Sequence, residues 1–297
     1  MGDVSNQTDN LVYDSSLKTN ERTAIHSGKA DDRWVFTEDN PAREYQIAAY
    51  IAASGRVLRN YNAAMSAECI EVAEKLWHSD SEIKRRALVN KIHAAIELYI
   101  TTGKDEYKQF IISNRETIES QISSLGWVLG RALPFLHDDT FTASVNKAVA
   151  QYAAKVKDEQ QQNPFGVPYK PVIWGAGWNI QKFGVEQYFL YTGFPEIVDK
   201  EYMLNALNFV LGCHPGENTA SFASGVGSRS MTAAYGYNRA DWSYIPGGVV
   251  SGTALIRPDF PELKDFPYLW QQAEYVLGGG SSNYMFLVLA ADEVLNK

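Results

Sequence analysis

One acidic residue near the end of the chain has neighbours that could give it chemistry. Glu274 lies close to Trp270 and Tyr275, shortly before three consecutive glycines, in the segment QQAEYVLGGGSSNYMFLVLAADEVL of residues 271–295. Burial beside aromatic rings raises the pKa of a carboxyl, and a carboxyl that stays protonated near neutral pH can donate a proton. Adjacent glycines favour unusual dihedrals, so they predict a sharp turn before the last helix. The alternative is a flexible turn with Glu274 in solvent.

A long connection upstream carries more polar and aromatic side chains. Residues 212–266 are rich in glycine and aromatic residues, and connections of this length are usually functional. The stretch AYGYNRADWSYIPGG, residues 234–248, places hydrogen-bonding groups beside an aromatic ring, a mixture that suits a ligand with many hydroxyls. The side chains expected to contact such a ligand are Arg229, Tyr237, Asn238, Arg239 and Trp242.

A glycine turn in the middle of the chain adds two tryptophans. Trp174 and Trp178 flank Gly175 and Gly177 in PVIWGAGWN, residues 171–179. Exposed aromatic rings stack on sugars, whereas most large aromatic side chains are largely buried. A binding platform and a core position are therefore both open for this pair.

The other polar candidates favour structural roles. Asp31 and Asp32 predict a solvated turn, and Asp138 with Asp139 predicts a helix cap. His93 has apolar neighbours at helical spacing, which favours a core position over a metal ligand. Neither a calcium-type acidic loop nor a zinc-type Cys/His spacing occurs, so the sequence predicts no metal and no cofactor.

The composition is that of an ordinary globular chain. Its 297 residues are 45% hydrophobic, enough for a sizeable core, and the formal net charge of −8 argues against nucleic acid or an anionic membrane as partner. No apolar run reaches the roughly 18 residues of a membrane span, and no export signal is recognisable, so the location stays unknown. Cys69 and Cys213 show no pairing pattern, and their state stays undecided.

Helices must position these candidates, because helical periodicity runs through most of the chain. Residues 1–32 are a polar, irregular lead-in, and a helical domain is expected over residues 33–297. Its first helix lies in residues 38–61, which open with cap residues and Pro41. Further helices are expected within residues 62–79, 82–103, 105–114, 116–136, 139–162, 177–193 and 199–216, with two more after the long connection. The total is about ten helices, with no pair of strands.

Two segments repeat one helix–turn–helix pattern. LYITTGKDEYKQFI, residues 98–111, and YFLYTGFPEIVDKEYMLNAL, residues 188–207, each place Thr-Gly at a helix end before a polar turn and a Tyr-bearing helix. Antiparallel hairpins of this kind stack side by side. A closed ring of hairpins is one natural outcome.

The long connection also resembles that of a known family. LNALNFVLGCHPGENTASFASGVGSRS, residues 204–230, followed by an Arg and then PGGVVSG, is similar to the C-terminal half of the glycoside hydrolase family 9 module, a cellulase-type (α/α)6 toroid. The residues that match the family pattern in order are Leu211, Gly212, Pro215, Ser221, Phe222, Gly225, Gly227, Arg239, Pro246 and Gly247. The Ala-rich segment 39–58 and the Trp174 turn resemble two further family elements, so the resemblance covers about residues 33–297.

The resemblance implies an all-α (α/α)6 toroid that cleaves O-glycosidic bonds of a β-glucan-type polysaccharide with inversion, as an endoglucanase does. Glu274 is the carboxylate nearest to the position of the family's general acid, so the resemblance implies that it is the catalytic residue. The substrate-binding residues implied are Trp174, Trp178, His214, Arg229, Tyr237, Asn238, Arg239 and Trp242. His214 replaces a usual Asn, and Tyr237 with Asn238 replaces a His pair, so the glycan and its linkage stay undecided.

The family's general base lies in an Asp-x-x-Asp motif on an early loop, and residues 1–32 carry no such motif. With about ten helices, fewer than the family's toroid has, the chain is expected to be incomplete and to lack the first helices and the base. Two functions follow: a glycosidase, or a non-catalytic carbohydrate-binding toroid, with a helical polysaccharide lyase as a distant third. The expected partner is a polysaccharide or oligosaccharide, not nucleic acid or a membrane. The family implies a secreted or periplasmic location, and the oligomeric state stays unknown.

Overall fold

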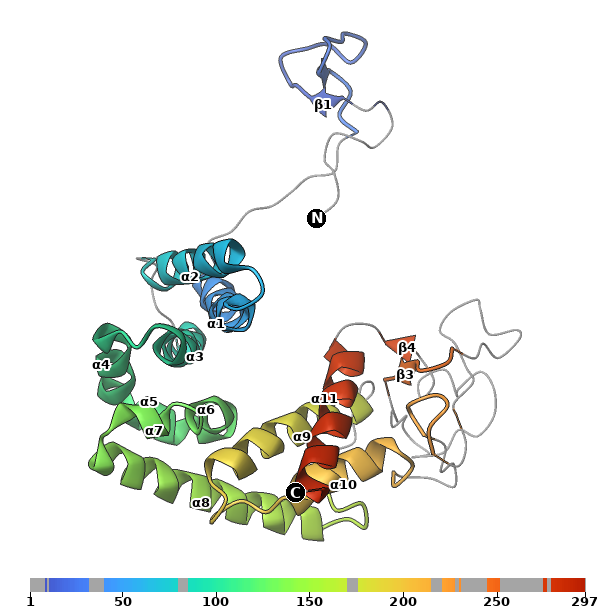
Figure 1. Ribbon diagram of the computed structural model, residues 1–297. Coiled ribbons are helices and arrows are strands. Elements are labelled where there is room, and N and C mark those ends of the chain that lie inside the picture. The colour runs from blue at the N-terminus through green and yellow to red at the C-terminus, as the bar shows by residue number, and fades with distance from the viewer. Residues whose placement is uncertain are drawn as a thin grey trace. The chain divides into compact units, whose positions relative to one another are not determined.

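The computed structural model describes residues 9, 11–31, 40–79, 85–169, 176–214, 221–227, 230, 245–251, 275–276 and 279–296 (Figure 1). The chain divides into two compact units, Met1–Pro41 and Ala42–Lys297. The described residues contain eleven helices and only two pairs of very short strands, which confirms the all-α prediction. The domain boundary placed at residue 33 from the sequence stays a prediction.

The first unit contains the first strand pair. Strand β1, Val12–Tyr13, pairs in parallel with β2, His26–Ser27. Gly28 follows β2 and lies against the backbone of residue 18. A Cβ added to Gly28 would lie only 1.9 Å from the Lys18 carbonyl oxygen, so only glycine fits there. The prediction of no strand pair was therefore wrong, since alternation cannot be recognised over two residues.

The second unit begins with helical hairpins. The helices are α1 Pro41–Leu58, α2 Ala63–Trp77, α3 Arg85–Thr102, α4 Asp105–Ser113, α5 Arg115–Ser120, α6 Ile122–Leu129, α7 Leu133–Leu136, α8 Asp139–Gln161, α9 Ala176–Gly193, α10 Glu201–Val210 and α11 Gly279–Leu295. Asp138 caps α8, as predicted, by accepting a 2.8 Å hydrogen bond from the Phe141 backbone N–H. Gly103 ends α3 in the left-handed region at φ 70°, which favours glycine.

Two helix predictions were wrong. The helix expected over 116–136 is broken into α5, α6 and α7, and Gln121, between the first two, has φ −115° and ψ 26° instead of helical angles. Of the two helices expected after the long connection, only α11 lies among the described residues. Tyr275–Val276 forms strand β4, which pairs antiparallel with β3, Val249–Val250. Gly279 and Gly280 form the first turn of α11 instead of a sharp turn before it, and Gly278 lies outside the described residues.

The helices α1, α3 and α6 run parallel to one another. Near the starts of α1 and α3, Asn90 Nδ2 donates a 2.6 Å hydrogen bond to the Ala42 carbonyl oxygen. Near their ends, Arg56 donates a 2.7 Å hydrogen bond to Glu97. α3 and α6 also meet start to start around a pocket and end to end where Arg131, just after α6, donates to Glu97.

The helices α9 and α11 continue this parallel set. A Cβ added to Gly126 of α6 would lie 3.1 Å from Leu190 of α9. Further toward the C-terminal ends of both helices, Gly130 lies against Gly193, so α6 and α9 run in the same direction. From α9 to α11, Gly184 lies against Leu287, and Tyr188 donates a 2.8 Å hydrogen bond to Glu293. Other helices lie between the parallel ones in the sequence and return the chain each time.

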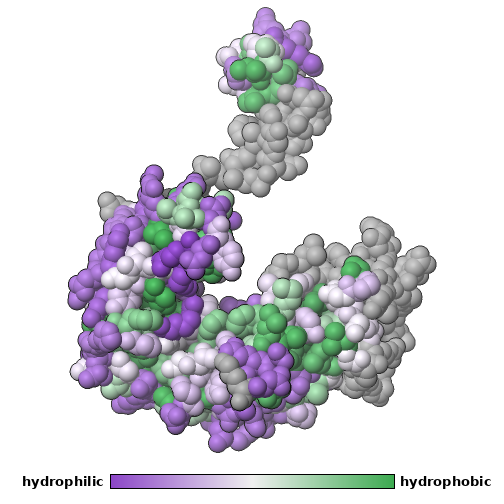
Figure 2. Space-filling view, in the orientation of Figure 1, coloured by the Kyte–Doolittle hydropathy of each residue, from purple (hydrophilic) through white to green (hydrophobic). Residues whose placement is uncertain are grey.

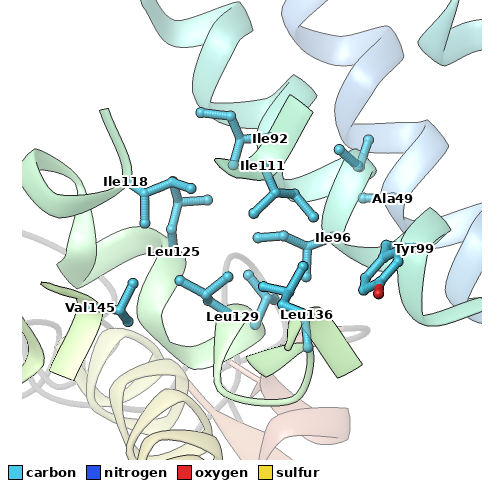
Figure 3. Close-up of a cluster of buried hydrophobic side chains, with 14 of the residues drawn as sticks. Ala49, Ile92, Ile96, Tyr99, Ile111, Ile118, Leu125, Leu129, Leu136 and Val145 are labelled. Carbon is cyan, nitrogen blue, oxygen red and sulfur yellow. The ribbon is translucent and has the colours of Figure 1, made fainter. Parts of the chain in front are cut away.

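Apolar side chains of the parallel helices and of the helices between them form the core. Figure 3 shows the centre of the largest cluster, where residues of α3, α4, α5 and α6 meet Val145 of α8. The members labelled there include Ile92, Ile96, Ile111, Ile118, Leu125 and Leu129, all of which are buried. Two smaller clusters join α9 to α10 and α11. The apolar residues that recur at helical spacing in the sequence are therefore the ones that these helices bury against one another.

α1 and α11 also expose apolar side chains. On α1 these are Ile47, Tyr50 and Val57, and on α11 they are Met285, Val288 and Leu289. Figure 2 shows the hydrophobic residues over α11 on the surface of the second unit. Both helices therefore carry apolar side chains that the described part of the chain leaves uncovered.

Two backbones cross closely where α6 and α9 end. A Cβ added to Gly193 would lie 2.8 Å from the Gly130 Cα, a distance that requires a backbone shift. Gly193→Ala is expected to lower the free energy of unfolding by about 1 to 3 kcal/mol, measured by urea denaturation. Gly103→Asn serves as the control, because no atom lies within 4 Å of a Cβ there and Asn tolerates the left-handed region. Equal costs at the two sites would show that the crossing is not tight.

A buried carboxyl on α9 makes stability depend on pH. Burial raises the pKa of Glu186 from 4.5 to about 7, although Lys182, at 3.7 Å, lowers it in part. Tyr152 of α8 faces the same carboxyl, and burial together with Glu186 raises the pKa of Tyr152 to about 12. Because the folded state holds the Glu186 proton more tightly, its stabilising effect is complete below pH 4.5 and is lost as the pH rises through 7.

Glu186→Gln should remove this loss of stability. We expect the variant to be more stable than the parent protein by about 1 to 3 kcal/mol at pH 8 and nearly equal to it at pH 4.5, measured by urea denaturation at both values. Glu119→Gln, at an exposed position on α5, is the control and should show no such difference between the two pH values. A Glu186→Gln variant that is less stable at pH 8 would contradict the assignment.

Candidate active-site face

The edge at which the parallel helices begin is the candidate functional face. The connections that lead into α9 and α11 end side by side, because these two helices are parallel and adjacent, with Gly184 against Leu287 and Tyr188 bonded to Glu293. The connection into α11 is the long one that the sequence singled out, and the one into α9 carries the tryptophan turn. Described residues that are far apart in the sequence, such as Trp178 and Ser251, therefore meet at this end of α9 and α11, and loops held by a rigid scaffold often carry binding sites.

Backbone hydrogen bonds attach the described parts of the long connection to the helices. The Phe222 N–H donates to the Val210 carbonyl oxygen at the end of α10 (2.8 Å), and the Val250 N–H donates to the Phe222 carbonyl oxygen (2.9 Å). The Trp178 N–H, in α9, donates to the Ser251 carbonyl oxygen at 3.2 Å. The connection thus forms a small bridged layer over the ends of α9, α10 and α11, and Phe222 is fully buried beneath it.

Positive-φ glycines permit this layer. Gly225, Gly227 and Gly247 have φ of 84°, 80° and 71°, which other residues rarely adopt. A Cβ on Gly227 would also lie 3.1 Å from the Ser221 Cβ, so the turn is tight as well as left-handed. All three glycines belong to the residue pattern by which the sequence resembles the family.

Two of the predicted site residues lie among the described residues. Trp178 is half-buried in the first turn of α9, beside the connection through its backbone bond to Ser251. His214 is only 5% exposed and stacks on Phe222, with ring centroids 4.3 Å apart. Phe209 lies against the same imidazole edge-on, with centroids 5.9 Å apart. The ring of His214 thus belongs to the support of the connection in this structure.

The remaining predicted site residues lie outside the described residues. They are Glu274, Trp174, Arg229, Tyr237, Asn238, Arg239 and Trp242. Their roles accordingly stay predictions, as do those of Trp178 and His214 as substrate contacts. Among the residues that the structure describes, no group of three or more His, Cys, Asp or Glu is arranged to hold a metal ion, and no helix is long and apolar enough to cross a membrane.

One pocket was not foreseen from the sequence. It has a volume of about 410 Å³ and lies between the first turns of α3 and α6. Its lining consists of Arg86, Val89, Asn90, Gln121 and Ser124, so four of the five side chains are polar. Each is an unremarkable helix-surface residue in the sequence, and only the parallel contact of α3 and α6 brings them together.

A buried ion cluster, also not foreseen, joins α1, α3 and α6 near their C-terminal ends. Glu97 of α3 has a side chain only 3% exposed, and it accepts hydrogen bonds from Arg56 of α1 and Arg131 beyond α6. Arg56 also donates a 2.6 Å hydrogen bond to the Thr101 hydroxyl. The one sequence signal for this cluster was a single carboxylate within the apolar run HAAIELYI, because a buried acid needs a partner.

His93 lies beside this cluster and stays neutral. Burial is the main cause that lowers its pKa to about 4; the Arg131 charge acts in the same direction, and Glu97 opposes the shift. Its ring lies between Tyr50 and Trp127, with centroids 6.3 and 5.5 Å away. This placement agrees with the interpretation of His93 as a core residue.

Comparison with known proteins gives a consistent result. The family model described as Glycosyl hydrolase family 9 matches residues 5–253. A Cellulose 1,4-beta-cellobiosidase of Acetivibrio thermocellus is 26% identical over an alignment that covers 32% of this chain and 14% of the relative.

Solved structures share the fold. AaCel9A in complex with a cellobiose-like isofagomine has a TM-score of 0.68 at 14% identity, covering 90% of this chain and 58% of that one. A thermostable endoglucanase of Alicyclobacillus acidocaldarius has a TM-score of 0.65 at 14% identity, covering 89% and 57%. An endoglucanase of the termite Nasutitermes takasagoensis has a TM-score of 0.59 at 16% identity, covering 90% and 70%. The predicted (α/α)6 fold class is confirmed, and the chain spans a little over half the length of the first two structures.

Proposed function

We propose that this chain, which belongs to glycosyl hydrolase family 9, acts on the O-glycosidic bonds of a β-glucan-type polysaccharide. The observation that carries the proposal is the family match over residues 5–253. The complex of a structural relative with a cellobiose-like ligand supports an oligosaccharide as the partner. Action outside the cytoplasm, on a polymer too large to enter the cell, is part of the same proposal.

The proposed reaction is hydrolysis with inversion. A carboxylic acid protonates the leaving glycosidic oxygen, while a carboxylate about 6.5 to 9.5 Å away removes a proton from the water that attacks the opposite face of the sugar. We assign the acid role to Glu274, because it directly precedes β4, and β4 pairs with β3 at the face where the parallel helices begin. Aromatic neighbours in the sequence would raise its pKa and keep it protonated near neutral pH.

The long connection supplies the proposed substrate contacts. Arg239, Asn238 and Tyr237 offer hydrogen bonds to sugar hydroxyls, and Trp242 offers a ring face. Trp178 supports this assignment, because the start of α9 is bonded to Ser251 of the same connection. The other proposed contacts are Trp174, His214 and Arg229.

A second function is favoured by one observation. No Asp-x-x-Asp motif precedes α1 in the sequence, so no residue there is assigned as the general base. Without a base, the chain would bind glycan and hydrolyse it slowly, since general-base assistance contributes about 10² to 10⁴ in rate. The alternative function is therefore a carbohydrate-binding toroid without catalysis.

One experiment separates these functions. The purified chain is mixed with cellohexaose, binding is measured by calorimetry, and the anomeric form of the products is followed by NMR. Hydrolysis to α-anomeric products supports an inverting glycosidase, whereas binding without any hydrolysis supports the binding toroid. Failure to bind cellohexaose and related β-glucan oligosaccharides would contradict both, and products that absorb as unsaturated sugars would identify a lyase.

A further inference from the structure

The pocket between α3 and α6 has the chemistry of a second binding site. Its four polar side chains are a guanidinium, two amides and a hydroxyl, and its fifth lining residue is the apolar Val89. No carboxylate lines it, although the chain as a whole has a net charge of −8. The pocket is thus a locally basic, hydrogen-bonding cavity in an acidic protein. We propose that it binds a sugar that carries a carboxylate, such as a hexuronate unit of a glycan.

Arg86 is the group that would select the acidic sugar. It forms no ion pair with any residue that the structure describes, whereas Arg56, Arg115 and Arg131 each pair with a glutamate. A planar guanidinium binds a carboxylate through two parallel hydrogen bonds, a geometry that a neutral hydroxyl cannot match. A carboxylate ligand would therefore supply the partner that Arg86 lacks.

The two amides would recognise the sugar ring. Asn90 donates through Nδ2 to the Ala42 carbonyl oxygen at 2.6 Å, and Gln121 donates through Nε2 to the Ser120 carbonyl oxygen at 3.2 Å. These bonds restrict both side chains before a ligand arrives and leave their carbonyl oxygens as acceptors for sugar hydroxyls. Ser124 can both donate and accept. One acid group and several hydroxyls on a ligand match this set.

The position of the pocket links it to the glycan of the proposed function. The pocket lies at the first turns of α3 and α6, within the helical unit that carries most of the family match. A polysaccharide held there could place an acidic unit or side branch in the pocket. The choice of a sugar ligand rests on the proposed function, but recognition of the carboxylate rests only on the pocket and would not require hydrolysis.

Calorimetry with matched disaccharides tests the proposal. Cellobiouronic acid, in which one glucose of cellobiose is oxidised to glucuronate, is titrated into the full chain beside cellobiose, galacturonic acid and acetate. We expect cellobiouronic acid to bind at least about tenfold more tightly than cellobiose, because a charge-assisted bidentate pair is stronger than a neutral hydrogen bond. Acetate should bind more weakly than either uronate, which separates a sugar site from a simple anion site.

Variants locate the site. Arg86→Gln should abolish the preference for cellobiouronic acid, and Arg86→Lys should retain only part of it, because Lys keeps the charge but not the planar fork. Arg115→Gln makes the same charge change at an exposed, paired arginine and should leave the preference intact. Circular dichroism checks that each variant is folded.

Two results would overturn the proposal: equal binding of the two disaccharides, or an unchanged preference in Arg86→Gln. The result is independent of the hydrolysis assay. Uronate binding without cleavage would leave this site standing while the glycosidase proposal failed.

Discussion

Glu97→Ala is expected to lower the free energy of unfolding by about 3 to 5 kcal/mol. The substitution leaves Arg56 and Arg131 without the carboxylate that they share, and their side chains are only 26% and 27% exposed. It also unfastens the ends of α1, α3 and α6, which the same carboxylate joins. Urea denaturation followed by circular dichroism measures the loss.

A matched substitution controls for the change of residue type. Glu119→Ala removes a glutamate that pairs with Arg115 at 3.7 Å on the exposed face of α5, so we expect it to cost about 1 kcal/mol or less. Glu97→Gln keeps the volume and removes only the charge, and its cost should fall between the two. A Glu97→Ala variant as stable as Glu119→Ala would show that the buried cluster contributes no net stability.

Glu274→Gln is expected to lower the rate of β-glucan hydrolysis by a factor of about 10² to 10⁴. Glutamine has nearly the same shape as a protonated glutamate but cannot transfer a proton to the leaving oxygen. Binding of cellohexaose and the midpoint of thermal unfolding should change little. Long incubations at high protein concentration, with reducing sugar as the readout, provide the sensitivity that a slow reaction requires.

A change of leaving group tests the acid role specifically. A cellobioside with a dinitrophenyl leaving group departs without protonation, so Glu274→Gln should lose little of its rate on that substrate while it loses most of its rate on glucan. Equal losses on both substrates would indicate a role in binding or folding instead. Full activity on both would show that the general acid is another residue.

The helices could be predicted because each carries its own signal. Local residues mark the helix ends: Pro41 begins α1, Asp138 caps the start of α8, and the left-handed Gly103 follows the end of α3. The break at Gln121 and the helical start at Gly279 could not be predicted in this way. A glycine costs a helix only about 1 kcal/mol, so Gly279 can begin α11, and no residue in the sequence around Gln121 marks a helix end.

The candidate site was less predictable, because its parts come together only through the packing of separate helices. Arg56 and Arg131 each look like an ordinary helix-surface charge in the sequence, and Arg86 and Gln121 at the pocket look like ordinary surface residues, so only Glu97, within an apolar run, gave a signal. By contrast, the long connection was recognisable from its length and glycine content alone. Its glycines at 225 and 247 have the positive φ that such a segment requires.

The two ends of the parallel helices differ in how freely they could evolve. The Glu97 cluster and the Gly130–Gly193 crossing lie at the ends of α1, α3, α6 and α9, where one changed atom would disturb several helices. The described parts of the long connection are joined to α9 and α10 by backbone hydrogen bonds, and apart from the positive-φ glycines and buried rings such as Phe222 these bonds do not depend on side-chain identity. Libraries over the connections that keep these glycines and buried rings should consequently retain folded members far more often than libraries over the Glu97 cluster and the glycine crossing, so loop sequences can vary without first raising stability.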